Sequence, residues 1–130
     1  MISLLLMIIG GFLNAVQDTL SDHWEYSIFK KWGWSKDFWH KGSSWQRKNW
    51  LPDWIPDAFT DGWHITKFFK LVAYGFAIVF YTPLWQIWVL PIWITDFLII
   101  GMARNWTMSL FYHVILRDKK KEEEDARTNS

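Results

Sequence analysis

The sequence predicts an all-α integral membrane protein with three transmembrane helices, at about residues 1–22, 63–82 and 84–103. The first 16 residues carry no charge, and the stretch 71–103 carries one charged residue, Asp96. Twelve tryptophans lie among and around these apolar runs. A bilayer core needs about 20 apolar residues per helix, and Trp and Tyr concentrate at its two interfaces. Apolar length and tryptophan placement therefore both indicate a membrane protein.

Composition excludes several classes of function. The chain has no cysteine, so it forms no disulfide, thiolate nucleophile or cysteine-based metal site. It also lacks a glycine-rich phosphate loop, a nucleophile elbow and a dinucleotide fingerprint, so we expect no nucleotide-type cofactor. The net charge of +1 is uninformative, because the positions of the charges carry the information.

The first predicted helix has a polar face. The N-terminus lacks the basic residues that begin a signal peptide, and Leu13-Asn14-Ala15 is a poor cleavage site, so we expect a retained membrane helix. Polar residues recur at spacings of three and four, which places them on one face, close to Gly10 and Gly11. Small and polar residues in membrane helices usually face protein or water. The polar residues are Asn14, Gln17, Asp18, Ser21, Asp22 and Glu25.

The segment 24–63 is predicted to lie in the headgroup layer. Glycines and prolines divide it into short pieces, and none is apolar enough to span a membrane. Alternating aromatic and basic residues suit short helices and loops with rings inward and cations toward phosphate. The same alternation can bind single-stranded nucleic acid, but the flanking spans favour the membrane, and we expect no nucleic acid partner. Its tryptophans are Trp24, Trp32, Trp34, Trp39, Trp45, Trp50, Trp54 and Trp63.

The second and third helices are predicted to form a hairpin. One helix over 64–103 would be about 60 Å long, twice the hydrocarbon core, so we expect a turn near Pro83. Pro91 should then kink the third helix. Residues 105–116 are amphipathic and form either a short interfacial helix or an extension of helix three.

We expect a single membrane domain over residues 1–116 and a charged, disordered tail over 117–130. Lysines and arginines lie between helices one and two, at the start of helix two, or after helix three. The positive-inside rule then places the central segment and the C-terminus in the cytoplasm and the N-terminus outside.

Asp96 is the costliest residue in the predicted spans, because a carboxylate in a membrane helix needs a partner or a wet cavity. It could relay protons or contact an ion or substrate. The favoured interpretation is a hydrogen-bonded side chain near the inner interface, paired with Arg104 or Lys67.

Four residues are candidates for catalysis or metal binding. Asp61 and His64 share a helix face, although Asp61 also fits a helix N-cap. Asp18 and His23 lie near the cytoplasmic end of helix one, so all four meet if helices one and two pack side by side. Such a cluster could hold a divalent zinc, manganese or iron ion, or act as acid and base on a lipid headgroup. The alternative is an interhelical network that only fixes packing, and the spacing matches no strong metal signature.

Several stretches resemble small, uncharacterised helical membrane proteins encoded by bacteria, notably Bacteroidetes, and by their phages. The resemblance covers about the first 80 residues. It implies a bacterial or viral membrane protein with no assigned activity, and we expect its location to be the bacterial inner membrane. The shared polar positions are Asn14, Asp18, His23, Asp61, His64 and Lys67. The stretches are Asn14-Ala15-x-x-Asp18, Ser27-Ile28-Phe29, Ser44-Trp45-Gln46-Arg47-Lys48 and Asp61-Gly62-Trp63-His64-x-x-Lys67.

The expected function is that of a small, non-enzymatic membrane component or assembly subunit, which packs in the lipid bilayer against itself or a membrane protein partner. One alternative is a metal-binding or acid/base enzyme that acts on a lipid-like substrate at the cytoplasmic leaflet. Another is a phage holin-like pore former, which the short apolar N-terminus and charged tail favour and the long Trp-rich segment does not.

Overall fold

A computed structural model describes residues 1–41, 59–83 and 91–128. Trp45, Trp50 and Trp54 of the Trp-rich segment, and residues 84–90 of the predicted third helix, lie outside the described residues. Within the described residues all regular structure is helical, apart from one isolated antiparallel bridge between Ser27 and Arg117. The all-α fold class is therefore confirmed.

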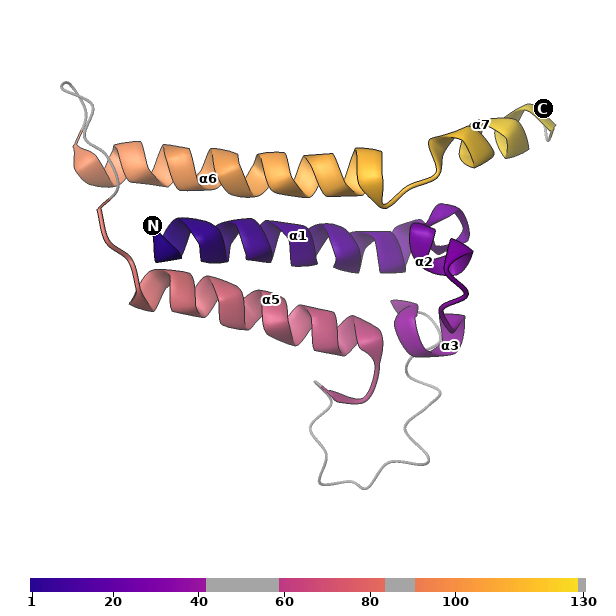
Figure 1. Ribbon diagram of the computed structural model, residues 1–130, viewed down its shortest axis with the longest axis horizontal. Helices are drawn as coiled ribbons and strands as arrows, with labels where there is room; N and C mark the ends of the chain where they lie inside the picture. Colours follow the sequence, from indigo (N-terminus) through magenta and orange to yellow (C-terminus); the bar gives the residue numbers. More distant parts are fainter. Residues whose placement is uncertain (42–58, 84–90, 129–130) are drawn as a thin grey trace.

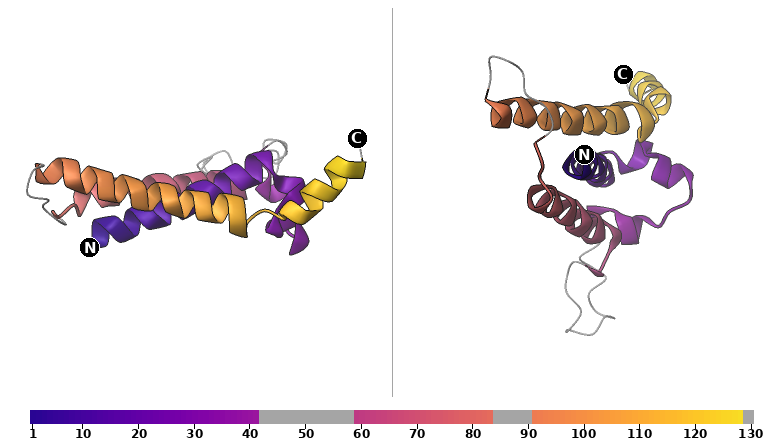
Figure 2. Two further views of the ribbon diagram at one scale, coloured as in Figure 1. Left: turned by 90° about the horizontal axis from the view of Figure 1, so that it is seen from above. Right: turned by 60° about the vertical axis from the view of Figure 1, so that its left-hand side comes forward.

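Three long helices lie side by side, with α1 (Ile2–Asp22) between α5 (Gly62–Val79) and α6 (Ile92–Leu110) (Figure 1). Helices α1 and α6 run in the same direction and α5 runs opposite to them. The extensive helix contacts are those of α1 with α5 and with α6, and two further views show the same central position of α1 (Figure 2). The second and third helices thus run antiparallel, as the predicted hairpin requires, but helix one separates them.

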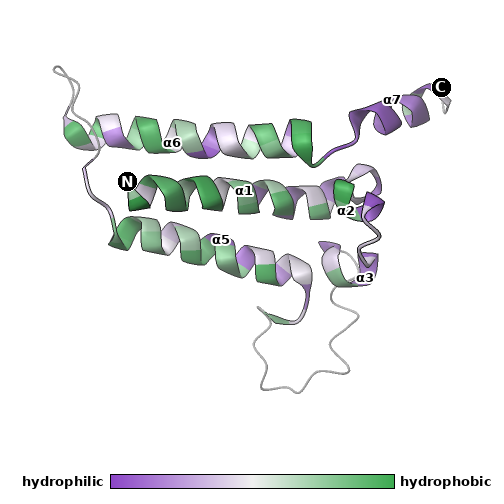
Figure 3. Cartoon of the chain, viewed as in Figure 1, coloured by the Kyte–Doolittle hydropathy of each residue, from purple (hydrophilic) through white to green (hydrophobic). Residues whose placement is uncertain are grey.

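Helix α1 has the predicted bounds. Its 21 residues correspond to about 31 Å, which matches a bilayer core. Among the described residues it is the one helix long and apolar enough to cross a membrane, a property shared by core helices of soluble proteins and by signal sequences. Helices α5 and α6 carry charged residues among their apolar ones, Lys67 and Lys70 in α5 and Asp96 and Arg104 in α6. Figure 3 shows hydrophilic positions between hydrophobic ones along both helices.

The starts of α5 and α6 are set by Asp61 and Pro91. The Asp61 side chain accepts the backbone N–H of His64 at 2.9 Å and so caps α5. The Pro91 carbonyl accepts the first backbone bonds of α6, from Ile94 at 3.0 Å and Thr95 at 3.2 Å. Proline lacks an N–H and fits at a helix start, so the predicted kink at Pro91 inside helix three is wrong. Helix α5 also ends at Val79, before the predicted residue 82.

Helix α6 continues directly into a π-helical turn, η4 (Phe111–Ile115). Residues 105–116 therefore extend helix three and form no separate interfacial helix. After η4 the chain returns to the end of α1. The Leu116 carbonyl accepts the N–H of Ile28 at 3.0 Å, and the Asp118 N–H donates to the Tyr26 carbonyl at 2.7 Å.

The charged tail forms α7 (Lys119–Thr128), which differs from the disordered tail that its composition predicts. Opposite charges three and four residues apart support a helix here, because such pairs face one another on its surface. The guanidinium of Arg117 also donates to both carboxylate oxygens of Glu122 at 2.6 Å, which fixes the first turn.

The described part of the Trp-rich segment is a packed aromatic cluster at one end of the bundle. It contains η1 (Trp24–Tyr26), α2 (Ile28–Lys31) and α3 (Lys36–Trp39). Trp24 and Phe29 are buried in a core with Ala15, Val16, Leu20 and Leu116. Trp34 stacks on Trp39 with ring centroids 4.4 Å apart. The Trp39 ring also packs against Gly62, where an added Cβ would lie only 2.0 Å from a ring atom. These rings therefore pack against other parts of the protein, in addition to any contact that they make with lipid.

Glu25 joins the short helices of this end. Its carboxylate pairs with Lys30 of α2 and, at 2.6 Å, with Lys36 of α3. These two hydrogen bonds lower the pKa of Glu25 to about 2. The ion pairs are half exposed, so they orient α3 more than they stabilise the fold.

Two adjacent glycines of α1 allow close contact with both neighbouring helices. A Cβ on Gly10 would meet the Tyr74 ring of α5 at 2.2 Å, and a Cβ on Gly11 would meet the Arg104 carbonyl oxygen of α6 at 2.6 Å. Small residues allow such contacts between helices.

We predict that Gly11→Ala lowers the free energy of unfolding by about 1–3 kcal/mol, because the new methyl group must displace the backbone of α6. Gly101→Ala is the matched control, since its Cβ meets no atom within 4 Å. The control should be neutral or stabilising by up to about 1 kcal/mol through helix propensity. Thermal unfolding in mild detergent, followed by circular dichroism, measures both. Equal destabilisation by the two variants would contradict the close approach at Gly11.

Candidate functional site

Polar side chains inside the bundle form three groups at different levels along α1. In the middle group, the Lys70 ammonium donates to the side-chain carbonyl of Asn14 at 3.0 Å and to that of Gln17. The Asn14 amide group donates in turn to Asp18 at 3.0 Å. Part of the polar face predicted for helix one therefore faces α5, where Asn14 and Gln17 accept hydrogen bonds from Lys70.

Arg104 connects α6 to α5 at the same level. Its Nε donates to the Tyr74 hydroxyl at 3.0 Å, and its guanidinium lies 5.7 Å from the Tyr74 ring centroid. The guanidinium also donates to Asn105 at 2.8 Å. This contact passes beside Gly10 and Gly11, where α1 leaves room for it.

The second group lies at the start of α5. The Asp61 side chain is 1% exposed, and its carboxylate accepts from Thr60 at 3.1 Å and from the His64 ring nitrogen Nδ1 at 2.6 Å. The His64 side chain is 36% exposed. The neighbouring Trp63 donates its Nε1–H to the Ser21 hydroxyl of α1 at 2.8 Å. Asp61 thus both caps the helix and orients an imidazole at the surface.

The structure brings together two of the four candidate residues. Asp61 and His64 form the pair just described, whereas Asp18 belongs to the Lys70 group and the His23 ring contacts Tyr112, with centroids 5.4 Å apart. The separation has a helical cause, because five residues at about 100° each place Asp18 and His23 about 140° apart around α1. Within residues 1–41, 59–83 and 91–128, no group of three His, Asp or Glu side chains could hold a metal ion.

The third group lies at the opposite end of the bundle. Asp96 is 1% exposed and accepts the Tyr81 hydroxyl hydrogen bond at 2.6 Å. Asp96 lies close to the start of α6 at Ile92, and the expected hydrogen bond is present, with Tyr81 as its partner. Of its expected partners, Arg104 lies about 12 Å further along the helix and binds Tyr74, and the Lys67 ammonium lies 5.2 Å from the Trp63 ring centroid.

Sequence reasoning missed Lys70, Tyr74, Arg104 and Tyr81 as members of these groups. The sequence does indicate a role for Lys70, since it follows Lys67 by three residues and so lies on the same helix face. The tyrosines had none, because the sequence of an apolar run does not show whether a tyrosine hydroxyl faces lipid or a polar partner.

Comparisons of this chain with protein-family models, with curated proteins and with solved structures find no match. Function is therefore argued from the geometry of the chain itself.

We predict that Asp18 is energetically coupled to Lys70 and not to His64. In a double-mutant cycle, Asp18→Asn and Lys70→Met should be less than additive by about 1 kcal/mol or more, because both act through Asn14. Asp18→Asn and His64→Ala should be additive within about 0.5 kcal/mol, since they share no direct partner. Denaturant unfolding in detergent measures both cycles. Coupling of Asp18 to His64 as strong as that to Lys70 would restore the four-residue cluster.

Proposed function

We propose that the chain is an integral membrane protein that crosses the bilayer three times and acts as a non-enzymatic membrane component, packed against lipid and against itself or a partner protein. The observation that carries this proposal is the apolar outer surface of α5 and α6. Ile78 of α5 is 79% exposed, and Phe97 and Trp106 of α6 are 76% and 75% exposed. Water would solvate such surfaces poorly, whereas hydrocarbon accepts them without cost.

Large apolar residues of α6 are exposed along its whole length. Trp93, Phe97, Met102, Trp106 and Leu110 are separated by four or five residues and are all at least half exposed. Asp96 is 1% exposed and Arg104 is only partly exposed, so the charged residues of α6 are less exposed than these apolar ones.

The polar residues of the helices support the same proposal. Lys70 binds Asn14, Arg104 binds Tyr74, Trp63 binds Ser21 and Tyr81 binds Asp96, and each pair joins two different helical segments. Polar groups at membrane depth are stable when they find partners inside the protein. Their use in holding helices together favours a packing role.

The three-span arrangement has a definite topology. The end of α1, the short helices α2 and α3, and α7 lie at one end of the bundle, and the N-terminus lies at the other (Figure 1). The positive-inside rule assigns the end with Lys30, Lys31 and Lys36 to the cytoplasm.

We predict that reporter fusions after Lys41 and after Ser130 both report the cytoplasm, while a fusion after Thr82 reports the outside. A reporter enzyme active only outside, paired with a fluorescent protein that matures only inside, gives opposite signals at each site. Cytoplasmic signals from all three fusions would reject the three-span topology.

The oriented imidazole of His64 favours a second candidate, an acid/base enzyme at the membrane surface. A buried carboxylate that binds Nδ1 leaves Nε2 to exchange protons with a substrate, as in hydrolases that use a histidine base.

If this candidate is correct, the purified protein in phospholipid nanodiscs should convert lipid to a product detectable by mass spectrometry. His64→Ala and Asp61→Asn should lower the rate by about 10²–10⁴. Asparagine still caps a helix, so Asp61→Asn preserves the fold. His23→Ala is the matched control, because His23 contacts a tyrosine ring and should leave the rate unchanged. Absence of product from the wild-type protein with a panel of phospholipids would contradict the enzyme candidate, and the packing role would be the remaining proposal.

A further inference from the structure

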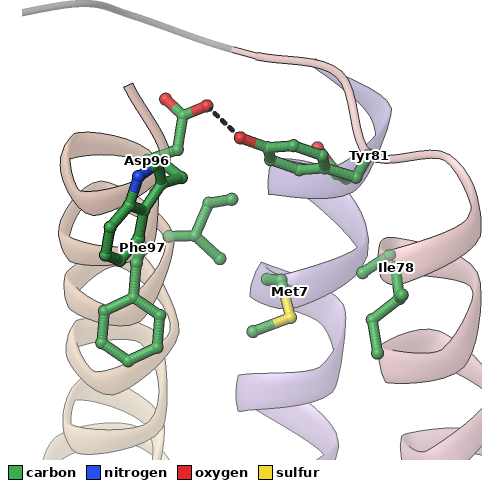
Figure 4. A pocket seen from close by; sticks show the side chains of 9 residues that line it. Met7, Ile78, Tyr81, Asp96 and Phe97 are labelled. Carbon is green, nitrogen blue, oxygen red and sulfur yellow. Dashed lines mark hydrogen bonds between the residues drawn. The ribbon is translucent and has the colours of Figure 1, made fainter. Parts of the chain in front are cut away.

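A cavity of about 340 Å³ lies between α1, α5 and α6 at the end of the bundle that carries the N-terminus. Its walls are apolar and include Met7, Ile78 and Phe97, and its polar members are Ser3, Tyr81 and Asp96. Figure 4 shows the Asp96 carboxylate and the Tyr81 hydroxyl joined across one end of the cavity, with Met7, Ile78 and Phe97 further along it. The cavity thus has an apolar body and a polar, acidic end.

Ser3 supplies an independent sign that the polar end takes a ligand. Its side chain is 1% exposed, and its hydroxyl has no hydrogen-bond partner among the described residues. A buried hydroxyl without a partner destabilises the folded protein, and native proteins rarely leave one unsatisfied. Because Ser3 lines the cavity, a ligand atom at its polar end would satisfy this group.

The chemistry of the polar end selects a hydrogen-bond donor of positive charge. An ionised carboxylate only accepts hydrogen bonds, and its two oxygens can accept from several donors at once, as the Asp96 carboxylate does from the Tyr81 hydroxyl. An ammonium group has three donors, enough to meet Asp96 and the Ser3 oxygen together. An anionic head would be repelled by Asp96, and a purely apolar ligand would leave Ser3 unsatisfied.

The apolar end selects a hydrocarbon chain. Phe97 and Ile78 line the cavity and are also the most exposed large hydrophobic residues of their helices, so the cavity borders the surface that contacts lipid. Its volume is at the lower end of the range for ligand sites, about 300–1,000 Å³, which suits one chain segment. A chain can therefore enter sideways from the bilayer.

We infer that this cavity binds a long-chain amphiphile with a primary amine head, whose ammonium group meets Asp96 and Ser3 and whose chain lies along Met7, Ile78 and Phe97. The inference rests on the proposed membrane location. The amine can belong to a free alkylamine or to the headgroup of an aminophospholipid.

The test uses the full chain reconstituted in phosphatidylcholine vesicles with a trace of one nitroxide-labelled probe: stearylamine, phosphatidylethanolamine or phosphatidylcholine. Electron paramagnetic resonance measures the fraction of each probe whose motion the protein restricts. We expect the relative association constant of stearylamine to exceed that of phosphatidylcholine several-fold. A matching preference for phosphatidylethanolamine identifies a lipid headgroup as the source of the amine, and preference for stearylamine alone identifies a free amphiphile.

Asp96→Asn should reduce the association of the amine probe to the phosphatidylcholine level. Ser3→Ala, a small change that keeps the charge, should reduce it about two-fold, and it preserves the test if Asp96→Asn fails to fold. Glu123→Gln on exposed α7 is the charge-matched control and should retain the preference.

Equal restriction of all probes by the wild-type protein would overturn the amine site while leaving the membrane location intact. An unchanged preference in a folded Asp96→Asn variant, or in Ser3→Ala where Asp96→Asn does not fold, would overturn it as well. Failure of the protein to insert, with no restricted component for any probe, would overturn both this inference and the proposed function.

Discussion

The close approach at Gly10 and Gly11 is the constraint on which the bundle depends. Helix α1 lies between α5 and α6. Its two glycines lack side chains, so the Tyr74 ring of α5 can pack against Gly10 and the Arg104 backbone of α6 against Gly11. Tyr74 and Arg104 then reach one another and hydrogen-bond beside the glycines. In the proposed membrane location the hydrophobic effect would not drive helices together, so close packing and interhelical hydrogen bonds would have to do so. Both act here at one level of the bundle.

That packing fixes where the polar groups go. Lys70 and Arg104 would be costly on a lipid-facing surface, and composition alone makes α5 and α6 poor candidates for membrane spans. The geometry reduces this cost, because Lys70 binds Asn14 and Gln17 of α1 and Arg104 binds Tyr74. The large apolar residues of α6 stay exposed, whereas Asp96 is buried. A hydropathy average over a helix conceals which of its polar residues are paired inside the protein.

Periodicity and local chemistry were enough to predict part of this structure. The bounds of α1, its polar face and the Asp61 cap follow from spacing along a single helix, where 3.6 residues per turn decides what shares a face. The four candidate residues do not form one cluster, because Asp18 and His23 lie near one end of α1 but point in different directions. Pro91 lies at the start of α6 and not within a helix, and a proline in an apolar run does not by itself distinguish these two positions. The bridge between Ser27 and Arg117 joins residues 90 positions apart, and neither carries a local signal of it.

The two ends of the bundle are held in different ways, and this difference bears on where a ligand can enter. At the end formed by α2, α3 and α7, backbone bonds between Tyr26, Ile28, Leu116 and Asp118 join the two halves of the chain, and Trp39 packs on Gly62. At the other end the Tyr81 and Asp96 side chains join the end of α5 to the start of α6. Side chains change rotamer on far shorter timescales than packed backbone rearranges. An amine that binds Asp96 can thus replace or share the Tyr81 contact without disturbing the helices, because their packing is set elsewhere, at the glycines and in the aromatic cluster.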